Sequence, residues 1–207
     1  GAQAVLAWTF NSHLGGEEQA LFGLLDHDDR PSWKLDEFAT ITGEDTRSWD
    51  GYLGAHRRRR EYFKRAGATS TDHGHPTART ADLTAREAES LFRRVTGERP
   101  SAADAELFRA QMLTEMARMS LDDGLVMQIH PGSLRNHNRA LFASHGRDKG
   151  ADIPTATDYV HALQPLLGRF GNDPRLMLIV FTLAPLWGML AAACGVVIVA
   201  RPDAGRG

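Results

Sequence analysis

The sequence lacks the features that define several large protein classes. Cys194 is the one cysteine among 207 residues, which rules out a disulfide-stapled scaffold and fits a reducing compartment. Positive and negative charges almost cancel, with 24 Lys and Arg against 26 Asp and Glu. Because no overall field attracts polyanions, nucleic acid is not an expected partner and an anionic membrane is not favoured. The chain also shows no internal repeat and no low-complexity tract.

The composition is that of a globular protein. Hydrophobic residues make up 42% of the chain and charged residues 24%, close to the average for folded domains. The length suits one ordinary domain or two small ones and is sufficient to bury a core. Histidine stands out, because nine are present and several lie close together in the sequence.

Signals for export and membrane insertion are weak. The N-terminal apolar patch has no basic region before it, so it is a poor signal peptide, and we expect a cytoplasmic protein. The uncharged run 176–200 is long enough to span a bilayer,. The alternative is a buried parallel strand over 176–183, because such strands are continuous apolar runs. We favour the strand.

Hydrophobic periodicity and breaker residues predict an alternation of helices and strands. Thr84 and Glu87 form a capping box, which marks the start of a helix. The expected elements are helix 17–25, acidic loop 26–31, helix 42–65 closed by Gly67, strand 68–72, helix 84–96, helix 101–121, strand 125–129, helix 156–170 and strand 176–183. This order predicts an α/β fold with a parallel sheet.

The first loop with functional side chains follows the strand at 68–72. Asp72, His73 and His75 stand together there, and ligands bind at the carboxyl ends of parallel strands. An H-x-H pair with an aspartate offers groups suited to Zn²⁺ or to acid–base chemistry. A loop whose histidines cap backbone groups or face water is equally consistent with the sequence.

The second such loop follows the strand at 125–129. His130 comes directly after that strand, and Arg135 could clamp a carboxylate with two hydrogen bonds,. Asn136 and Asn138 could bond to sugar hydroxyls. The alternative is a loop that caps the next helix and faces solvent.

Other conspicuous residues have simpler explanations. The basic run 57–60 wraps around its helix, so we expect a solvated face. Cys194 lies in an apolar run without a nearby histidine, which does not suit a catalytic thiol,. Apolar side chains are expected inside, namely Trp49, Leu53, Tyr62, Phe63, Leu107, Met112, Met116 and Met119.

Several stretches resemble the uronate isomerase family, which acts on glucuronate and galacturonate. They include ITGEDTRSWDGYL, RRREYFKRAGATSTDHGHPTARTADL, GLVMQIHPGSLRNHNRALF and GRDKGADIPTATDYVHALQPLLGRFGNDPRLMLIVFTL. The resemblance covers about 41–183. It implies a partial (β/α)8 TIM barrel of the amidohydrolase-like kind with helical insertions. It also implies an aldose–ketose isomerase that moves a proton between C2 and C1 of a hexuronate.

The resemblance further implies roles for individual residues. His130 and Arg135 match the family's HPG-x-x-R loop and are the expected catalytic residues, with Arg135 contacting the substrate. Asp72 and His73 match its DHG loop; with His75, Asn136 and Asn138 they are expected to bind substrate. A divalent metal, commonly zinc, belongs to the family, but its ligands are an H-x-H on the first strand and an aspartate on the last strand. Both lie outside the matched region, so we expect no metal ligand here.

The resemblance also divides the chain into three segments. They are a poorly matched segment 1–40, an isomerase-like partial barrel 41–183 and an unmatched apolar tail 184–207. A barrel needs about 250 residues, so we expect a fragment with little or no activity of its own. A second copy could cover the open sheet, which leaves a homo-oligomer open. The alternatives are a membrane-anchored, non-enzymatic domain with 176–200 as its anchor, and an amidohydrolase-type metallohydrolase.

Overall fold

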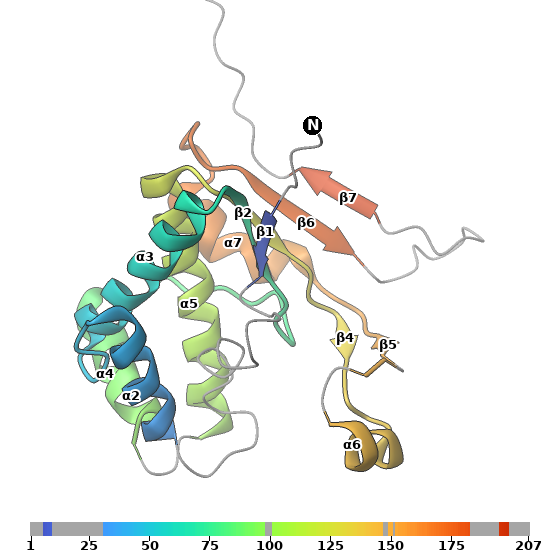
Figure 1. Cartoon of the computed structure of the whole chain (residues 1–207). Coiled ribbons are helices and arrows are strands. Elements are labelled where there is room, and N and C mark those ends of the chain that lie inside the picture. Colours follow the sequence, from blue (N-terminus) through green and yellow to red (C-terminus); the bar gives the residue numbers. More distant parts are fainter. Residues whose placement is uncertain are drawn as a thin grey trace, which may run out of the picture.

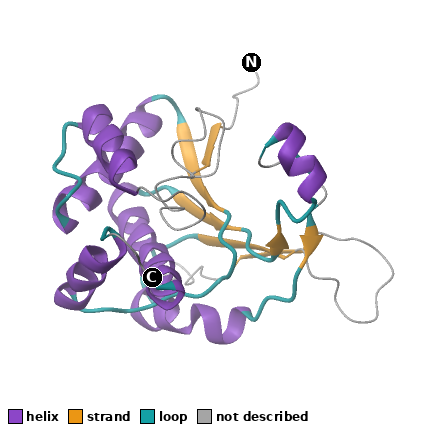
Figure 2. Ribbon diagram, turned by 90° about the horizontal axis from the view of Figure 1, so that it is seen from below, coloured by secondary structure: helices purple, strands orange, loops and turns teal. Residues whose placement is uncertain are grey.

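The computed structural model describes residues 6–9, 31–97, 101–146, 149–150, 152–182 and 195–198. Figures 1 and 2 show α2 to α5 and α7 gathered beside the main sheet, whereas α6 stands apart beyond β4. The elements are β1 (Leu6–Thr9), α2 (Pro31–Thr42), α3 (Trp49–Arg65), β2 (Ala68–His73), α4 (Ala85–Val95), α5 (Ala102–Asp123), β3 (Val126–Ile129), β4 (Ser133–Leu134), α6 (Arg139–His145), β5 (Ile153–Pro154), α7 (Tyr159–Phe170), β6 (Leu178–Thr182) and β7 (Gly195–Ile198).

The main sheet has the strand order β1-β2-β3-β6-β7. The first four strands are parallel, and β7 pairs with β6 in the antiparallel sense. The expected parallel α/β arrangement is therefore confirmed. Two parts of the apolar run 176–200 form β6 and β7, so the strand interpretation of 176–183 is confirmed as well.

Local capping explains where the helices begin and end. Thr84 accepts a hydrogen bond from the backbone of Glu87, whose side chain bonds back to the cap, so the predicted capping box is present. Ser101 caps α5, and Gly124 ends it with a φ of 75°. Only glycine adopts that left-handed conformation without steric cost. Both helices therefore begin where the sequence signals indicate, and α5 ends at the expected glycine.

The core lies between the helices and one face of the sheet. Met127 and Ile129 of β3 are buried there, as are Leu178 and Val180 of β6. The methionines at 112, 116 and 119 on α5 fill the same core, with exposures of 1% or less, as expected from their helical spacing. Trp49 and Leu53 join them, but Tyr62 is 52% exposed, so its predicted place in the core was wrong.

Two further expectations need correction. The helix predicted over 42–65 starts later than expected: α2 ends at Thr42, and α3 begins only at Trp49, because the Ser48 side chain caps it by accepting a hydrogen bond from the backbone N–H of Gly51. The basic run is not wholly solvated, since Arg60 is 1% exposed. Its guanidinium contacts both carboxylate oxygens of Asp123, at 2.5 and 2.9 Å. This pair joins α3 to the end of α5.

Other elements carried no clear sequence signal. The prediction missed helices α2 and α6 and strands β1, β4, β5 and β7. The helix expected over 17–25 lies outside the described residues, as does all of the acidic loop except Pro31, which begins α2. The short strands β4 and β5 form a separate antiparallel ribbon, with Leu134 opposite Ile153.

Candidate functional site

The register of β2 and β3 decides which way each candidate side chain points. Asp72 is the partner of Gln128, and His73 is the partner of Ile129. Successive side chains of a strand point to opposite faces, and Ile129 is buried in the core beneath the helices. His73 therefore points toward the helices, whereas Asp72 points to the opposite face. The side chains of these two adjacent residues therefore lie on opposite faces of the sheet.

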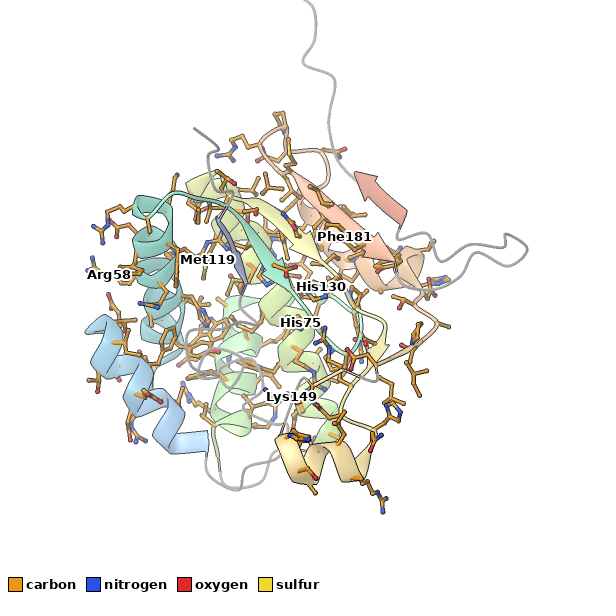
Figure 3. All side chains as sticks on the ribbon, turned by 45° about the vertical axis from the view of Figure 1, so that its right-hand side comes forward. Arg58, His75, Met119, His130, Lys149 and Phe181 are labelled. Carbon is orange, nitrogen blue, oxygen red and sulfur yellow. The ribbon has the colours of Figure 1, made fainter. Side chains whose placement is uncertain are left out.

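Asp72 meets His130, which directly follows β3. Nε2 of His130 lies 3.0 Å from Oδ1 of Asp72, and both side chains are about one-fifth exposed. The contact has ion-pair distance, although the ring does not meet hydrogen-bond geometry. The backbone N–H of His130 donates to the carbonyl oxygen of His73, which continues the strand pairing by one residue. Figure 3 shows His130 and His75 near the ends of these strands.

This pair has the chemistry of an acid–base site. Histidine can gain and lose a proton near neutral pH, and a neighbouring carboxylate orients its ring and stabilises the protonated form. The His130 side chain is 22% exposed, although its Nε2 atom is buried against Asp72. Catalytic hydrogen bonds are often poorly aligned until substrate binds, so the imperfect alignment is compatible with such a role.

His73 lies in a different environment. It is 1% exposed, and its Nε2 lies 2.9 Å from the hydroxyl oxygen of Thr71. Burial, followed by the positive charges of neighbouring groups, holds the pKa of His73 well below its usual range. The structure therefore places a neutral imidazole beneath the sheet, where it supports the strand end on which Asp72 stands.

His75 completes the H-x-H pair, and its ring centroid lies 6.3 Å from that of His73. Burial and then the Arg109 guanidinium lower the pKa of His75 to about 4. Glu106 opposes this shift and accepts hydrogen bonds from Thr77, at 2.6 Å, and from Arg109, at 3.0 Å. Sequence reasoning missed this support from α5, because no spacing rule connects residues so far apart in the chain.

These groups do not form a complete metal site. Across the residues that the structure describes, no group of three or more His, Cys, Asp or Glu side chains is arranged to hold a metal ion. His73, in addition, already has Thr71 within hydrogen-bond distance. The donor set among the described residues therefore does not form a complete metal site.

The loop after His130 is held against the segment that leads into α7. Gly132 has a φ of 95°, and a Cβ at that position would lie 2.5 Å from the hydroxyl oxygen of Thr157. Its carbonyl oxygen accepts a hydrogen bond of 2.7 Å from the backbone N–H of Thr155. Glycine is therefore required here by both conformation and space. The contact fixes where the β4–β5 ribbon leaves the sheet (Figure 1).

The ribbon carries the remaining candidate residues. Arg135 follows β4 and is 35% exposed, with its Nε 4.0 Å from the carboxylate of Asp152. Asn136 has a φ of 56°, in the left-handed region, which asparagine tolerates better than most residues. Asn138 caps α6 by accepting a hydrogen bond of 3.0 Å from Leu141. For Asn138 the structure thus shows the helix-capping alternative, and substrate contact stays a prediction.

Known proteins resemble this chain in both sequence and fold. A family model described as glucuronate isomerase matches residues 25–196. The chain is 71% identical over 149 residues to a uronate isomerase of Sphingopyxis alaskensis, a match that covers 72% of this chain and 32% of the relative. A uronate isomerase of Phenylobacterium zucineum is 70% identical over 149 residues, covering 72% and 31%.

Solved structures give the same result for the fold. A glucuronate isomerase from Caulobacter crescentus superposes with a TM-score of 0.74 at 53% identity, covering 86% of this chain and 40% of that chain. A uronate isomerase from Thermotoga maritima superposes with a TM-score of 0.72 at 22% identity, covering 86% and 43%. The predicted fold, a partial amidohydrolase-like TIM barrel, is confirmed.

The chain spans about a third of the length of these curated relatives. The comparisons give no support to a metallohydrolase or to a membrane-anchored domain, because the relatives are named as isomerases. Among the described residues, no helix is both long and apolar enough to cross a bilayer.

Proposed function

We propose, since this chain belongs to the glucuronate isomerase family, that it supplies part of the active site of an aldose–ketose isomerase. The substrates are hexuronates: D-glucuronate, converted to D-fructuronate, and D-galacturonate, converted to D-tagaturonate. The observation that carries the proposal is the Asp72–His130 contact at the carboxyl edge of the parallel sheet. That edge is where ligands bind in parallel α/β folds.

In this proposal His130 moves the proton. Neutral imidazole takes the proton from C2, the electrons of that C–H bond form a C1=C2 double bond, and the π electrons of the C1=O bond move onto O1 to give an enediolate. The hydroxyl proton passes from O2 to O1, the electrons on O2 form the C2=O bond, and the C1=C2 π electrons take the proton back from the imidazolium at C1. Asp72 orients the His130 ring and stabilises its positive charge while the proton is held. The single pair can serve both transfers because C1 and C2 are adjacent.

Arg135 binds the carboxylate of the substrate. A guanidinium forms two parallel hydrogen bonds with a carboxylate, and the 35% exposure of this side chain leaves it accessible. Asn136 lies next to it and is assigned to sugar hydroxyls, with Asn138 at the start of α6. His73 lies on the face of the sheet opposite Asp72 and is assigned a supporting role for the strand end that carries Asp72. His75, in the loop after β2, is retained as a substrate-binding residue.

The family resemblance implies a divalent metal, but the described side chains supply no complete ligand set for it. No step is assigned to a metal for that reason. We retain the division into 1–40, 41–183 and 184–207 as part of the proposal. A cytoplasmic location, which the lone cysteine suits,, and pairing of two copies across the open sheet belong to it as well.

A chimera tests the proposed function. The matching 149 residues of the Sphingopyxis alaskensis relative are replaced by those of this chain, and turnover of D-glucuronate is measured. We expect the chimera to be active and His130→Gln in it to reduce kcat by about 10²–10⁴-fold, the usual contribution of acid–base catalysis. The 207-residue chain alone should show little or no turnover.

His145→Gln is the matched control, because His145 is exposed at the end of α6. Full activity of the His130→Gln chimera would contradict the acid–base role. A folded chimera that neither binds nor converts glucuronate would contradict the proposed function as a whole.

A further inference from the structure

The β4–β5 ribbon brings a carboxylate beside the candidate substrate-binding arginine. Ser133 lies opposite Pro154, and Leu134 lies opposite Ile153. In an antiparallel pair, the next residue of one strand faces the preceding residue of the other. Arg135 and Asp152 occupy these positions, and their Nε and Oδ2 atoms are 4.0 Å apart. Both the register and the ion-pair distance therefore place Asp152 next to Arg135.

The contact between Arg135 and Asp152 contributes little to stability, but the charge of Asp152 affects any anion that binds Arg135. Both side chains are about one-third exposed, at 35% and 36%, and exposed ion pairs contribute little to stability. Asp152 is therefore not needed to hold the ribbon, which is anchored by the Gly132–Thr155 hydrogen bond. Its negative charge, however, repels any carboxylate or phosphate that binds Arg135.

We propose that Asp152 is a specificity-determining residue that makes this site prefer anions of a single charge to dianions. The inference rests on the proposed function, in which Arg135 binds the carboxylate of a hexuronate. Repulsion from Asp152 is about twice as large for a dianion as for a monoanion at the same position. Hexuronates, with one negative charge, are thereby favoured over sugar phosphates, with two.

Removing the charge should relax this selectivity. For unit charges about 8 Å apart in a medium of nearly aqueous dielectric, Coulomb's law gives an effect on affinity of about threefold for a monoanion. The same calculation gives about tenfold for a dianion. Asp152→Asn should therefore tighten binding of D-glucuronate about threefold and of glucose 6-phosphate about tenfold. Added salt should reduce both effects, because the site is partly exposed.

The experiment follows the Nε–H signal of Arg135 by NMR in the 207-residue chain. D-glucuronate, acetate and glucose 6-phosphate are titrated into the wild type and Asp152→Asn. Asp152→Glu keeps the charge and should bind like the wild type. Asp36→Asn is a control for net charge, because Asp36 is 60% exposed on α2 and pairs with Arg47 instead.

The gain in affinity that Asp152→Asn gives for each anion distinguishes the outcomes. A larger gain for glucose 6-phosphate than for D-glucuronate in Asp152→Asn supports it. An equal gain for both anions, no gain, or no anion binding to either protein overturns it. If D-glucuronate binds no more tightly than acetate while the charge effect persists, the proposed function loses support and the role of Asp152 stands.

Discussion

Three histidines whose pKa the fold lowers should make this protein sensitive to mild acid. His56 and His73 are each 1% exposed. Burial, followed by the charges of Arg60 and Arg57, lowers the pKa of His56 to about 3. Burial also keeps the pKa of His73 far below its usual range and lowers that of His75 to about 4. All three rings are therefore neutral in the folded protein near pH 5.

The effect on stability follows from the protons taken up on unfolding. In the unfolded chain each histidine has a pKa of about 6.5, so below that pH the unfolded state binds protons that the folded state does not. Stability is unaffected above about pH 7.5 and falls as the pH drops through 6.5. At pH 5 each histidine lowers the free energy of unfolding by about 2 kcal/mol, or about 6 kcal/mol for three. That approaches the whole stability of a typical domain.

Urea unfolding between pH 7.5 and pH 5, followed by tryptophan fluorescence, measures this dependence. The slope of unfolding free energy against pH should correspond to nearly three protons in its steepest part. His56→Gln should remove about one proton from that slope whatever its effect on absolute stability. His145→Gln should leave it almost unchanged, since His145 is exposed. Stability that stays level from pH 7.5 to pH 5 would refute the reasoning.

Substitutions at two places test contacts that the fold creates. Asp123→Asn leaves the buried Arg60 without its carboxylate and should lower the free energy of unfolding by about 3–5 kcal/mol, the range for breaking a buried pair,. Arg60→Met should cost less, because Asp123 is 23% exposed and can be hydrated; urea unfolding that ranks them in the opposite order contradicts this. Gly132→Ala combines an unfavourable φ with a contact to Thr157 and should cost about 1–3 kcal/mol. Adding Thr157→Ala should recover only part of that loss, and full recovery would show that the backbone conformation carries no strain.

Local signals predicted those elements whose boundaries depend on neighbouring residues. The capping box at Thr84 and Glu87 marked the start of α4, and Gly124 marked the end of α5. A cap satisfies backbone groups within one turn, so its information is contained in a few consecutive residues. The start of the helix expected over 42–65 was wrong for a related reason, because Thr42 and Asp45 resemble a helix start, whereas the residue that caps α3 is Ser48.

The sequence alone identified the two loops that bear the candidate site and the family to which they point. It placed His130 and Asp72 at the ends of neighbouring strands, and the structure brings these residues to 3.0 Å. Sequence spacing could do this because parallel strands align their carboxyl ends at one edge of the sheet.

Only the tertiary structure decided how the side chains are divided between the two faces. The register of β2 against β3 turns His73 toward the helices while its neighbour Asp72 faces the candidate site. The same is true of Arg60, whose burial depends on Asp123, 63 positions away. Burial and ion pairing depend on which distant segments of the chain meet in the fold. A run of four consecutive arginines therefore does not show that one of them, Arg60, pairs with Asp123.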